Sequence, residues 1–334
     1  MTHFLVTSFP LHGHINHPTF EFAWRLARAG ARVTFLSSVA AYWRIIESPP
    51  LDASSCASFS NGYDDGFNFP INNDSTKITS KRADNTPRSR CANPHDVALE
   101  LQIPSVALWI QPAAVLAVYY HYFHGYDHLI NKVKIDPDFL VELPKVPPMA
   151  SIDLPSMLLP SDPHFGYPHS IPGPPPLIDK ELKEGRPKPR LLVNKFDSSE
   201  RVANGSVDEL DLICIGPLIS STPKKTSSGS DCMEWLESRL ASSVVYVCFG
   251  SVISPCKRQM EEILNRLLEA RRPFLWVIKG SDTGSETGEI KNRVDGCGEG
   301  LVVPWCSQVE ALARPSAGCF VTHCGWNSTS GEFG

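Results

Sequence analysis

Apolar residues in the first forty positions occur either in short continuous runs or at one-turn spacing. These two patterns predict a strand, a helix and a second strand. Short apolar runs at 3–8 and 32–37 predict the strands. Between them, Phe22 and Leu26 stand one helical turn apart and mark the apolar face of a helix over 18–29. A strand, a helix and a strand in direct succession predict a right-handed βαβ unit and therefore a parallel sheet.

Alternating strand and helix patterns recur along the rest of the chain. We predict strands at 105–110, 190–195, 212–215, 243–249, 273–278, 301–304 and 318–322. We predict helices at 113–130, 231–239 and 258–271, a turn at 308–313, and a further helix that begins near Asn327. The segment 279–300 is rich in glycine and charge, so it is predicted to be a loop. Strands that alternate with helices are typical of α/β proteins with parallel sheets.

Two irregular segments divide this pattern. Fourteen of the 29 prolines fall within residues 136–189, and such a stretch holds neither long helices nor central strands. Residues 220–230 are polar and rich in Ser, Thr, Lys, Pro and Gly, which is the composition of a linker. We therefore predict an N-terminal domain at 1–219 and a second domain at 231–334, each built on a doubly wound, Rossmann-like sheet.

Composition narrows the class of protein. The chain has 334 residues with 31 Lys and Arg against 36 Asp and Glu, and its net charge of −5 argues against nucleic-acid binding. None of the ten cysteines forms a Cys-x-x-Cys pair, which indicates reduced thiols and a cytoplasmic location. The most apolar stretch, 106–123, is interrupted by polar residues and is too short for a membrane span. The first residues lack the basic and apolar regions of a signal peptide.

The sequence lacks three common enzyme motifs in the contexts where they would be functional. No Gly-x-Gly-x-x-Gly follows the first strand, which leaves a nicotinamide oxidoreductase as a weak alternative. The phosphate-binding loop of P-loop enzymes and the Gly-x-Ser-x-Gly elbow of hydrolases are also missing. Ligands bind beyond the carboxyl ends of parallel strands, so the residues that follow the predicted strands are the candidates for function.

The loop after the first strand carries three histidines. His14 stands where the carboxyl end of that strand faces the ligand crevice, and an imidazole with a pKa of about 6.5 accepts a proton at neutral pH. The alternative is a histidine that only caps the next helix, and position by itself favours this alternative. A metal site formed with His12 and His17 is disfavoured, because no carboxylate stands nearby to orient the ligands. We therefore expect no metal.

Aromatic, polar and glycine residues gather at three strand ends in the second half of the chain. They are Ser251, Trp305, His323, Gly325, Asn327 and Ser328. Trp305 offers a flat face for a base, and the unpaired N–H groups of Asn327 and Ser328 at a helix N-terminus favour a phosphate. Taken singly, each tryptophan is better explained as core and each glycine as a turn. Three such junctions together favour binding of a nucleotide diphosphate.

Several segments resemble one enzyme family. WCSQVEAL at 305–312 and FVTHCGWNS at 320–328 resemble the opening of the signature box of plant UDP-dependent glycosyltransferases. GHIN at 13–16 resembles the N-terminal catalytic loop of that family, and 105–112 and 243–251 are similar to further family segments. The branch that contains anthocyanin 5-O-glucosyltransferases and crocetin glucosyltransferases is the most similar.

The resemblance implies a fold, a reaction and partners. The fold is α/β and GT-B-like, with two doubly wound Rossmann-like domains that bind the acceptor in the first half and a UDP-sugar in the second. The reaction is transfer of glucose from UDP-glucose to a hydroxyl or carboxylate of a small apolar, flavonoid-like plant metabolite, with inversion. The family needs no metal and no cofactor besides this donor, and we expect a monomer.

The resemblance also implies a role for individual residues. His14 is similar to the base that takes the proton from the acceptor hydroxyl. Trp305 is similar to the residue that stacks on uracil, Cys306 to a backbone contact and Gln308 to a ribose contact. The remaining UDP-sugar positions of the family correspond to Ser251, His323, Gly325, Trp326, Asn327 and Ser328.

The chain departs from the family pattern at several positions. An inserted residue, His17, follows Gly-His-Ile-Asn and can turn His14 by as much as ~100° about a helix axis. A polar, Pro-interrupted segment replaces the apolar strand expected before residue 97, and Asp96 is the carboxylate available there to orient the histidine. The ribose-binding Glu of the family corresponds to Gly331, and Glu332 comes one residue late.

The family carries an Asp-Gln pair that holds the sugar hydroxyls, and the sequence stops before it. We therefore interpret the second domain as incomplete and expect weak or absent transfer activity. The alternative to an active enzyme is a nucleotide-binding remnant without catalysis.

Overall fold

The computed structural model describes most of the predicted strands and helices. The described residues are 2–8, 18–39, 54–60, 97–98, 100–133, 135–155, 158, 178, 188–195, 207–219, 229–250, 255–278 and 286–332. His14, Asp96 and Ser251 lie outside these ranges, as do His12 and His17. The roles predicted for these residues therefore stay predictions.

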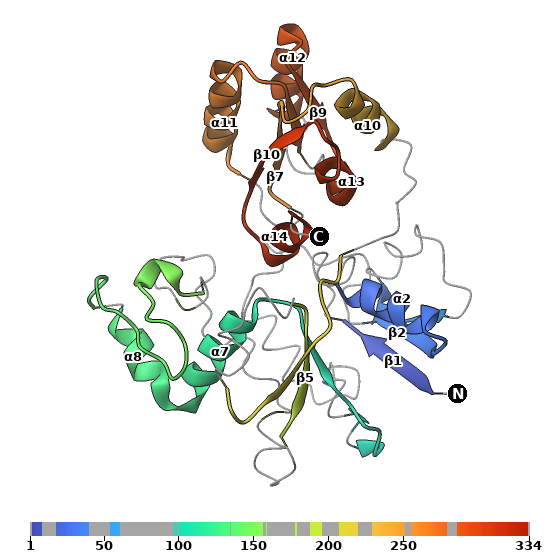
Figure 1. The fold of residues 1–334 in the computed structure, drawn as a ribbon, viewed down its shortest axis with the longest axis vertical. Coiled ribbons are helices and arrows are strands. Elements are labelled where there is room, and N and C mark those ends of the chain that lie inside the picture. Colours follow the sequence, from blue (N-terminus) through green and yellow to red (C-terminus); the bar gives the residue numbers. More distant parts are fainter. Residues whose placement is uncertain are drawn as a thin grey trace. The chain divides into compact units, whose positions relative to one another are not determined.

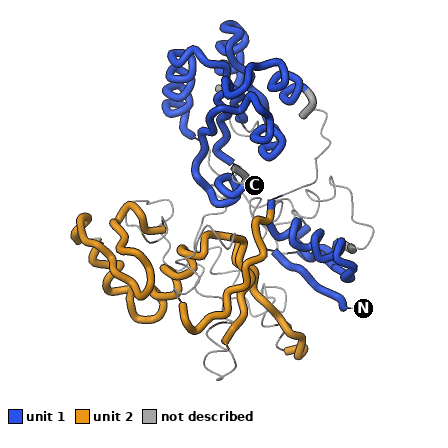
Figure 2. The backbone as a smooth tube through the Cα atoms, viewed as in Figure 1, with its two compact units in different colours: residues 1–65, 219–334 blue, residues 66–218 orange. Residues whose placement is uncertain are grey.

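Contacts within the chain divide it into two compact units (Figure 2). One unit comprises residues 1–65 and 219–334, and the other comprises residues 66–218. The first unit contains the sheets β1-β2-β3 and β10-β7-β8-β9, and the second contains the sheet β4-β5-β6. The predicted domain limits, 1–219 and 231–334, stay a prediction.

The N-terminal residues form a three-stranded parallel sheet with one helix. The strands are β1 (His3–Thr7), β2 (Arg32–Ser38) and β3 (Ser54–Phe59), in the order β1-β2-β3. Helix α2 (Phe20–Arg28) contributes Ala23 and Ala27 to a buried cluster with Val33 and Phe35 of β2. The predicted βαβ unit is confirmed by β1, α2 and β2. The sequence pattern did not predict β3, because its residues SSCASF are mostly small and polar.

The C-terminal residues form a four-stranded parallel sheet, seen in the upper part of Figure 1. Its strands are β7 (Val244–Cys248), β8 (Phe274–Val277), β9 (Gly300–Val303) and β10 (Ala317–Thr322). The order across the sheet is β10-β7-β8-β9. The chain thus runs outward from β7 through β8 to β9 and then returns to the other side of β7. This return creates a topological switch point between β7 and β10.

Helices cover both faces of this sheet. They are α10 (Gly229–Glu237), α11 (Lys257–Glu269), α12 (Glu286–Cys297) and α13 (Gln308–Leu312), and a further helix, α14 (Trp326–Glu332), follows β10. Residues of α10 and α13 share a buried cluster with Tyr246, whereas residues of α11 and α12 share another with Val247. Successive strand residues point to opposite faces, so the two helix pairs pack on opposite sides of β7.

Helix α12 corrects the prediction of a loop over 279–300. Its Ile290 and Val294 lie four residues apart, and they are only 5% and 0% exposed in the cluster beside β8. Gly288 and Gly296 lower the helix propensity of this segment, which hid the one-turn spacing of the two apolar residues. Burial against the sheet therefore overrides the weak local preference.

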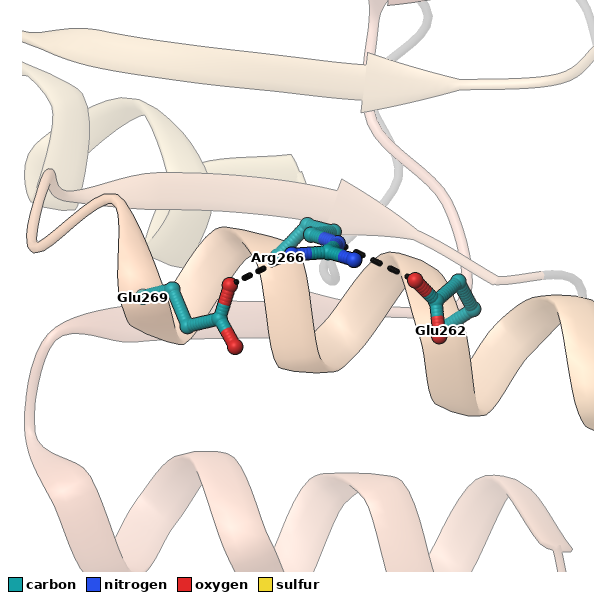
Figure 3. A network of polar contacts seen from close by, with 3 residues as sticks. All are labelled: Glu262, Arg266 and Glu269. Atoms are coloured by element: carbon teal, nitrogen blue, oxygen red, sulfur yellow. Dashed lines mark hydrogen bonds and ion pairs between the residues drawn. The ribbon is translucent and has the colours of Figure 1, made fainter.

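The outer face of α11 carries a small ion-pair network (Figure 3). Arg266 Nε donates to Glu262 Oε1 at 3.0 Å, and Arg266 Nη1 donates to Glu269 Oε2 at 2.9 Å. All three side chains are largely exposed, so water and salt screen their attraction. The same helix buries Met260 and Leu264 on its inner face, and that burial is what holds α11 on the sheet.

The second unit contains a three-stranded parallel sheet and a kinked helical segment. The strands are β4 (Ala107–Trp109), β5 (Arg190–Val193) and β6 (Asp211–Cys214). The helical elements are α7 (Ala113–His121), the π-helical turn η2 (Tyr122–Tyr126), α8 (Asp127–Lys132) and the 3-10 turn η3 (Ser151–Asp153). None of the helices in the part of the chain that the structure describes is long and apolar enough to cross a membrane.

A kink corrects the prediction of one helix over 113–130. His124 has φ −112° and Gly125 has φ +94°, so the helix is interrupted between α7 and α8. His121, His124 and His128 have the i, i+3 and i+7 spacing that is typical of one partly exposed helix face, but His121 is only 6% exposed. His124 Nδ1 lies 2.7 Å from the backbone oxygen of Tyr120, so this ring contacts the preceding turn.

Candidate functional site

The ends of β7 and β10 bring two separate segments together at the switch point. The last residue pair between these parallel strands joins Thr322 and Cys248. The residues that follow, Gly250 on one side and His323 on the other, therefore lie beyond the carboxyl ends of adjacent strands. Open parallel sheets bind their ligands at this kind of position.

His323 packs directly against two glycines. A Cβ atom placed on Gly250 would lie 2.6 Å from Cε1 of His323, and one placed on Gly325 would lie 3.0 Å from the same atom. Gly250 also has φ +75°, a backbone conformation that favours glycine. The imidazole thus occupies space that any side chain at either position would fill.

Burial lowers the pKa of His323 below its usual value. The ring is half-buried, and its Nδ1 atom lies 3.4 Å from Oγ1 of Thr322. A neutral imidazole has one N–H donor and one acceptor nitrogen. His323 is therefore suited to donate one hydrogen bond to an anionic oxygen at neutral pH.

Gln308 and Ser328 join the two motif segments. Gln308 Nε2 donates to the backbone oxygen of Ser328 at 3.3 Å, and Ser328 Oγ lies 3.4 Å from Gln308 Oε1. Gln308 begins α13, three residues after Trp305, and Ser328 lies in the first turn of α14. The segment that follows β9 and the segment that follows β10 therefore meet at these two side chains.

Trp305 and Cys306 follow β9 after Pro304, and their side chains have different surroundings. Trp305 is half-buried, whereas Cys306 is 6% exposed and its Sγ lies 3.0 Å from Sγ of Cys232 in α10. Burial raises the pKa of the Cys306 thiol far above its usual range, so the thiol stays protonated. Because the Cys306 side chain belongs to the core cluster, its backbone is the part left for a ligand.

The start of α14 differs from the sequence-based expectation in one respect. The N–H of Ser328 donates to the oxygen of Gly325 at 2.9 Å, and the N–H of Thr329 donates to the same oxygen at 3.0 Å. The prediction that Ser328 offers an unpaired N–H is therefore wrong, because the tight first turn uses this donor. Trp326 and Asn327 occupy the first two positions of the helix.

The structure thus brings some predicted residues together. Gln308 contacts Ser328, and His323 contacts Gly325. The sequence pattern places Gly250 just after the strand predicted at 243–249, but it does not reveal the contact of Gly250 with His323. That contact depends on the pairing of β7 with β10, which the apolar pattern alone does not predict. Glu332 is the last residue of α14, and its predicted ribose contact stays a prediction.

Comparison with known proteins places the chain in a family. Residues 214–331 match the family model described as UDP-glucoronosyl and UDP-glucosyl transferase. Crocetin glucosyltransferase, chloroplastic, from Gardenia jasminoides is 41% identical over 371 residues, which cover 98% of this chain and 76% of that protein. The chain belongs to this transferase family. Anthocyanidin 3-O-glucoside 5-O-glucosyltransferase 1 from Perilla frutescens is 39% identical, covering 97% of this transferase and 76% of that protein.

Solved structures confirm the predicted fold of this transferase. UDP-glucose: anthocyanidin 3-O-glucosyltransferase in complex with UDP matches with a TM-score of 0.72 and 22% identity, over 99% of this chain and 78% of that chain. Os79 from O. sativa in complex with UDP matches with a TM-score of 0.65 and 23% identity, over 98% of this chain and 78% of that chain. The α/β, GT-B-like architecture with parallel Rossmann-like sheets is therefore confirmed.

The match to the Gardenia protein is longer than this transferase. It extends over 371 positions, whereas the chain has 334 residues, so at least 37 matched positions have no residue here. The chain spans about three quarters of the length of this relative. Some positions of this relative therefore have no counterpart in the chain within the matched region.

Proposed function

We propose that this transferase binds UDP-glucose beyond the carboxyl ends of β7, β9 and β10 and transfers glucose to an apolar plant metabolite. The observation that carries the proposal is the contact between Gln308 and Ser328, which joins the two motif segments into one site. The relatives are named as glucosyltransferases of crocetin, anthocyanidin glucosides and phloretin. A hydroxyl or carboxylate of a flavonoid-like acceptor is the matching substrate class.

The donor occupies the C-terminal site in this proposal. Trp305 stacks on the uracil ring, and the backbone of Cys306 contacts the base. Gln308 contacts the ribose, and Glu332, the last residue of α14, supplies a second ribose contact in this proposal. The phosphate and sugar contacts come from the backbone of Gly325 and from Ser251, His323, Trp326, Asn327 and Ser328.

The transfer step is a displacement at the anomeric carbon. His14 takes the proton of the acceptor hydroxyl, with Asp96 as the carboxylate that orients its ring. The acceptor oxygen then bonds to the anomeric carbon from the face opposite UDP, the bond to the diphosphate breaks, and the configuration inverts. Negative charge grows on the leaving diphosphate, so fixed donors such as His323 stabilise the transition state.

We infer that the reaction needs no metal and no further cofactor, because side chains such as His323 supply donors to the diphosphate. Activity should therefore survive addition of a chelator. The nine cysteines within the described residues are free thiols, which supports a reducing compartment. We propose a cytoplasmic monomer, and a fluorescent fusion and gel filtration test this, with the chloroplast as the alternative location because one relative is named chloroplastic.

Calorimetric titration with UDP, UDP-glucose and NAD tests the nucleotide proposal. UDP and UDP-glucose should bind and NAD should not, and Trp305→Ala should weaken UDP by about tenfold or more, as loss of base stacking does. Trp24→Ala, on α2, is the matched control for removing a tryptophan and should leave UDP affinity unchanged. Binding of NAD in preference to UDP would favour an oxidoreductase instead.

Incubation with UDP-glucose and a panel of flavonoids tests catalysis. A glucosylated product that is lost in His14→Ala supports the transferase and its base. The internal positions missing from the match favour a second candidate, a nucleotide-binding remnant. Tight UDP binding without any product on the panel would support that remnant.

A further inference from the structure

Two backbone segments leave a gap that the ring of His323 fills. One ends at Gly250, after β7, and the other contains Gly325, after β10. An added Cβ on Gly250 would meet Cε1 at 2.6 Å and Nε2 at 3.2 Å, and one on Gly325 would overlap Nε2 and meet Cδ2 at 3.1 Å. A side chain at either glycine would therefore point at the same Cε1–Nε2 end of the imidazole.

We propose that Gly250 and Gly325 are positioning residues that seat His323 at the switch point and so determine its contact with the donor diphosphate. This inference rests on the proposed function for its effect on UDP. We call this packing of the His323 ring against Gly250 and Gly325 the seat, and it is present without any ligand. It assigns these glycines a role that acts through the histidine.

The orientation of the ring supports this role. Nδ1 lies 3.4 Å from Oγ1 of Thr322, which leaves Nε2 as the nitrogen at the glycine-lined end. An added Cβ on Gly325 would have to push Nε2 about 1 Å away to reach an ordinary van der Waals contact. Displacements of about 1 Å in a binding group are enough to cost two orders of magnitude in rate.

Backbone strain has to be separated from the contact with His323. Gly250 has φ +75°, so any substitution there is strained even without the imidazole. Gly298 has φ +70° but nothing within 4 Å of an added Cβ, so Gly298→Ala measures strain alone. Gly325 has no positive φ, so Gly325→Ala measures the contact with His323 alone. Its control is Gly296→Ala in α12, where an added Cβ has no neighbour within 4 Å.

A double-mutant cycle between Gly325→Ala and His323→Ala tests the proposal. Gly325→Ala should weaken UDP by about tenfold, equal to 1.4 kcal/mol, and lower the melting temperature. In the His323→Ala background the same change should have little effect on either, because the ring that it displaces is gone. Equal losses in both backgrounds would overturn the seat.

Thermal unfolding separates failure of the seat from failure of the proposed function. If the unaltered chain does not bind UDP, the proposed function is wrong, but the coupling of melting temperatures still tests the seat. If Gly325→Ala does not fold, a folded Gly325→Ala/His323→Ala double variant supports the seat. A double variant that also fails to fold, beside a folded His323→Ala, would contradict it.

Discussion

The Sγ atoms of Cys232 and Cys306 lie 3.0 Å apart, which ties α10 to the loop that follows β9. Cys232 is 0% exposed and Cys306 is 6% exposed. Reagents that modify thiols should therefore label the exposed Cys319 and Cys324 rapidly and this pair slowly, since burial raises the pKa of Cys306. Mass spectrometry of the time course reads this order, and rapid labelling of Cys306 would contradict the buried pair.

Cys232→Ala should destabilise the chain by about 1 to 3 kcal/mol, because it leaves a cavity in the core cluster. Cys319→Ala, at an exposed position of β10, is the matched control and should change the free energy of unfolding by less than about 0.5 kcal/mol. Urea unfolding of both variants measures the difference.

Gly300→Ala should destabilise the C-terminal sheet by about 1 to 3 kcal/mol, the usual cost of overpacking a core. Gly300 pairs with Phe274 across β9 and β8, and an added Cβ would lie 2.8 Å from Cε1 of that fully buried ring. Gly296→Ala has open space in α12 and should instead stabilise the helix by up to about 1 kcal/mol. Opposite shifts of the urea midpoint are the expected result, and equal shifts would contradict the packing of Phe274.

Asn194→Ala should destabilise the chain by about 1 to 3 kcal/mol, because it leaves a buried N–H without its acceptor. The Oδ1 atom of Asn194 accepts the N–H of Leu218 at 2.7 Å, and both residues are buried. Asn265→Ala is the matched control, because its Oδ1 accepts from Arg293 Nη2 at 2.9 Å on the exposed surface. Denaturant unfolding should show a clear loss only for Asn194→Ala.

The stability of the chain should fall as pH decreases below about 6.5, in part because of His323. Burial lowers the pKa of this ring in the folded state, so the unfolded chain binds the proton more tightly. The contribution of His323 to the free energy of unfolding is therefore complete above pH 6.5, the pKa of the ring in the unfolded chain. It is lost as pH falls through the lower pKa of the folded state. Melting temperatures of the unaltered chain and His323→Gln between pH 5 and 8 measure this, and parallel curves would contradict it.

Much of this fold follows from local sequence pattern. The strands β7, β8 and β10 are short apolar runs, and their predicted ranges lie within two residues of the observed ends. Strand β3 and helix α12 were missed, since one has few apolar side chains and the other contains two glycines. In both, pairing or burial against a distant segment supplies the stability that the local pattern lacks.

The sequence likewise predicts part of the candidate site. Trp305 and His323 were proposed as site residues because functional residues follow the strands of a parallel sheet, whereas Gln308 was proposed only from the resemblance to the family. The contacts of Gln308 with Ser328 and of Gly250 with His323 were not predicted, because they depend on which strand ends become neighbours in the sheet. That order is a property of the whole sheet, and short motifs do not contain it.

The crowding around His323 has a consequence at the level of the gene. Every missense change of the codons for Gly250 or Gly325 introduces at least one carbon where the ring already lies. A saturation library selected for donor binding should therefore be depleted of all alternatives at these two codons, small and large alike. The codon for Gly296, by contrast, should tolerate many replacements.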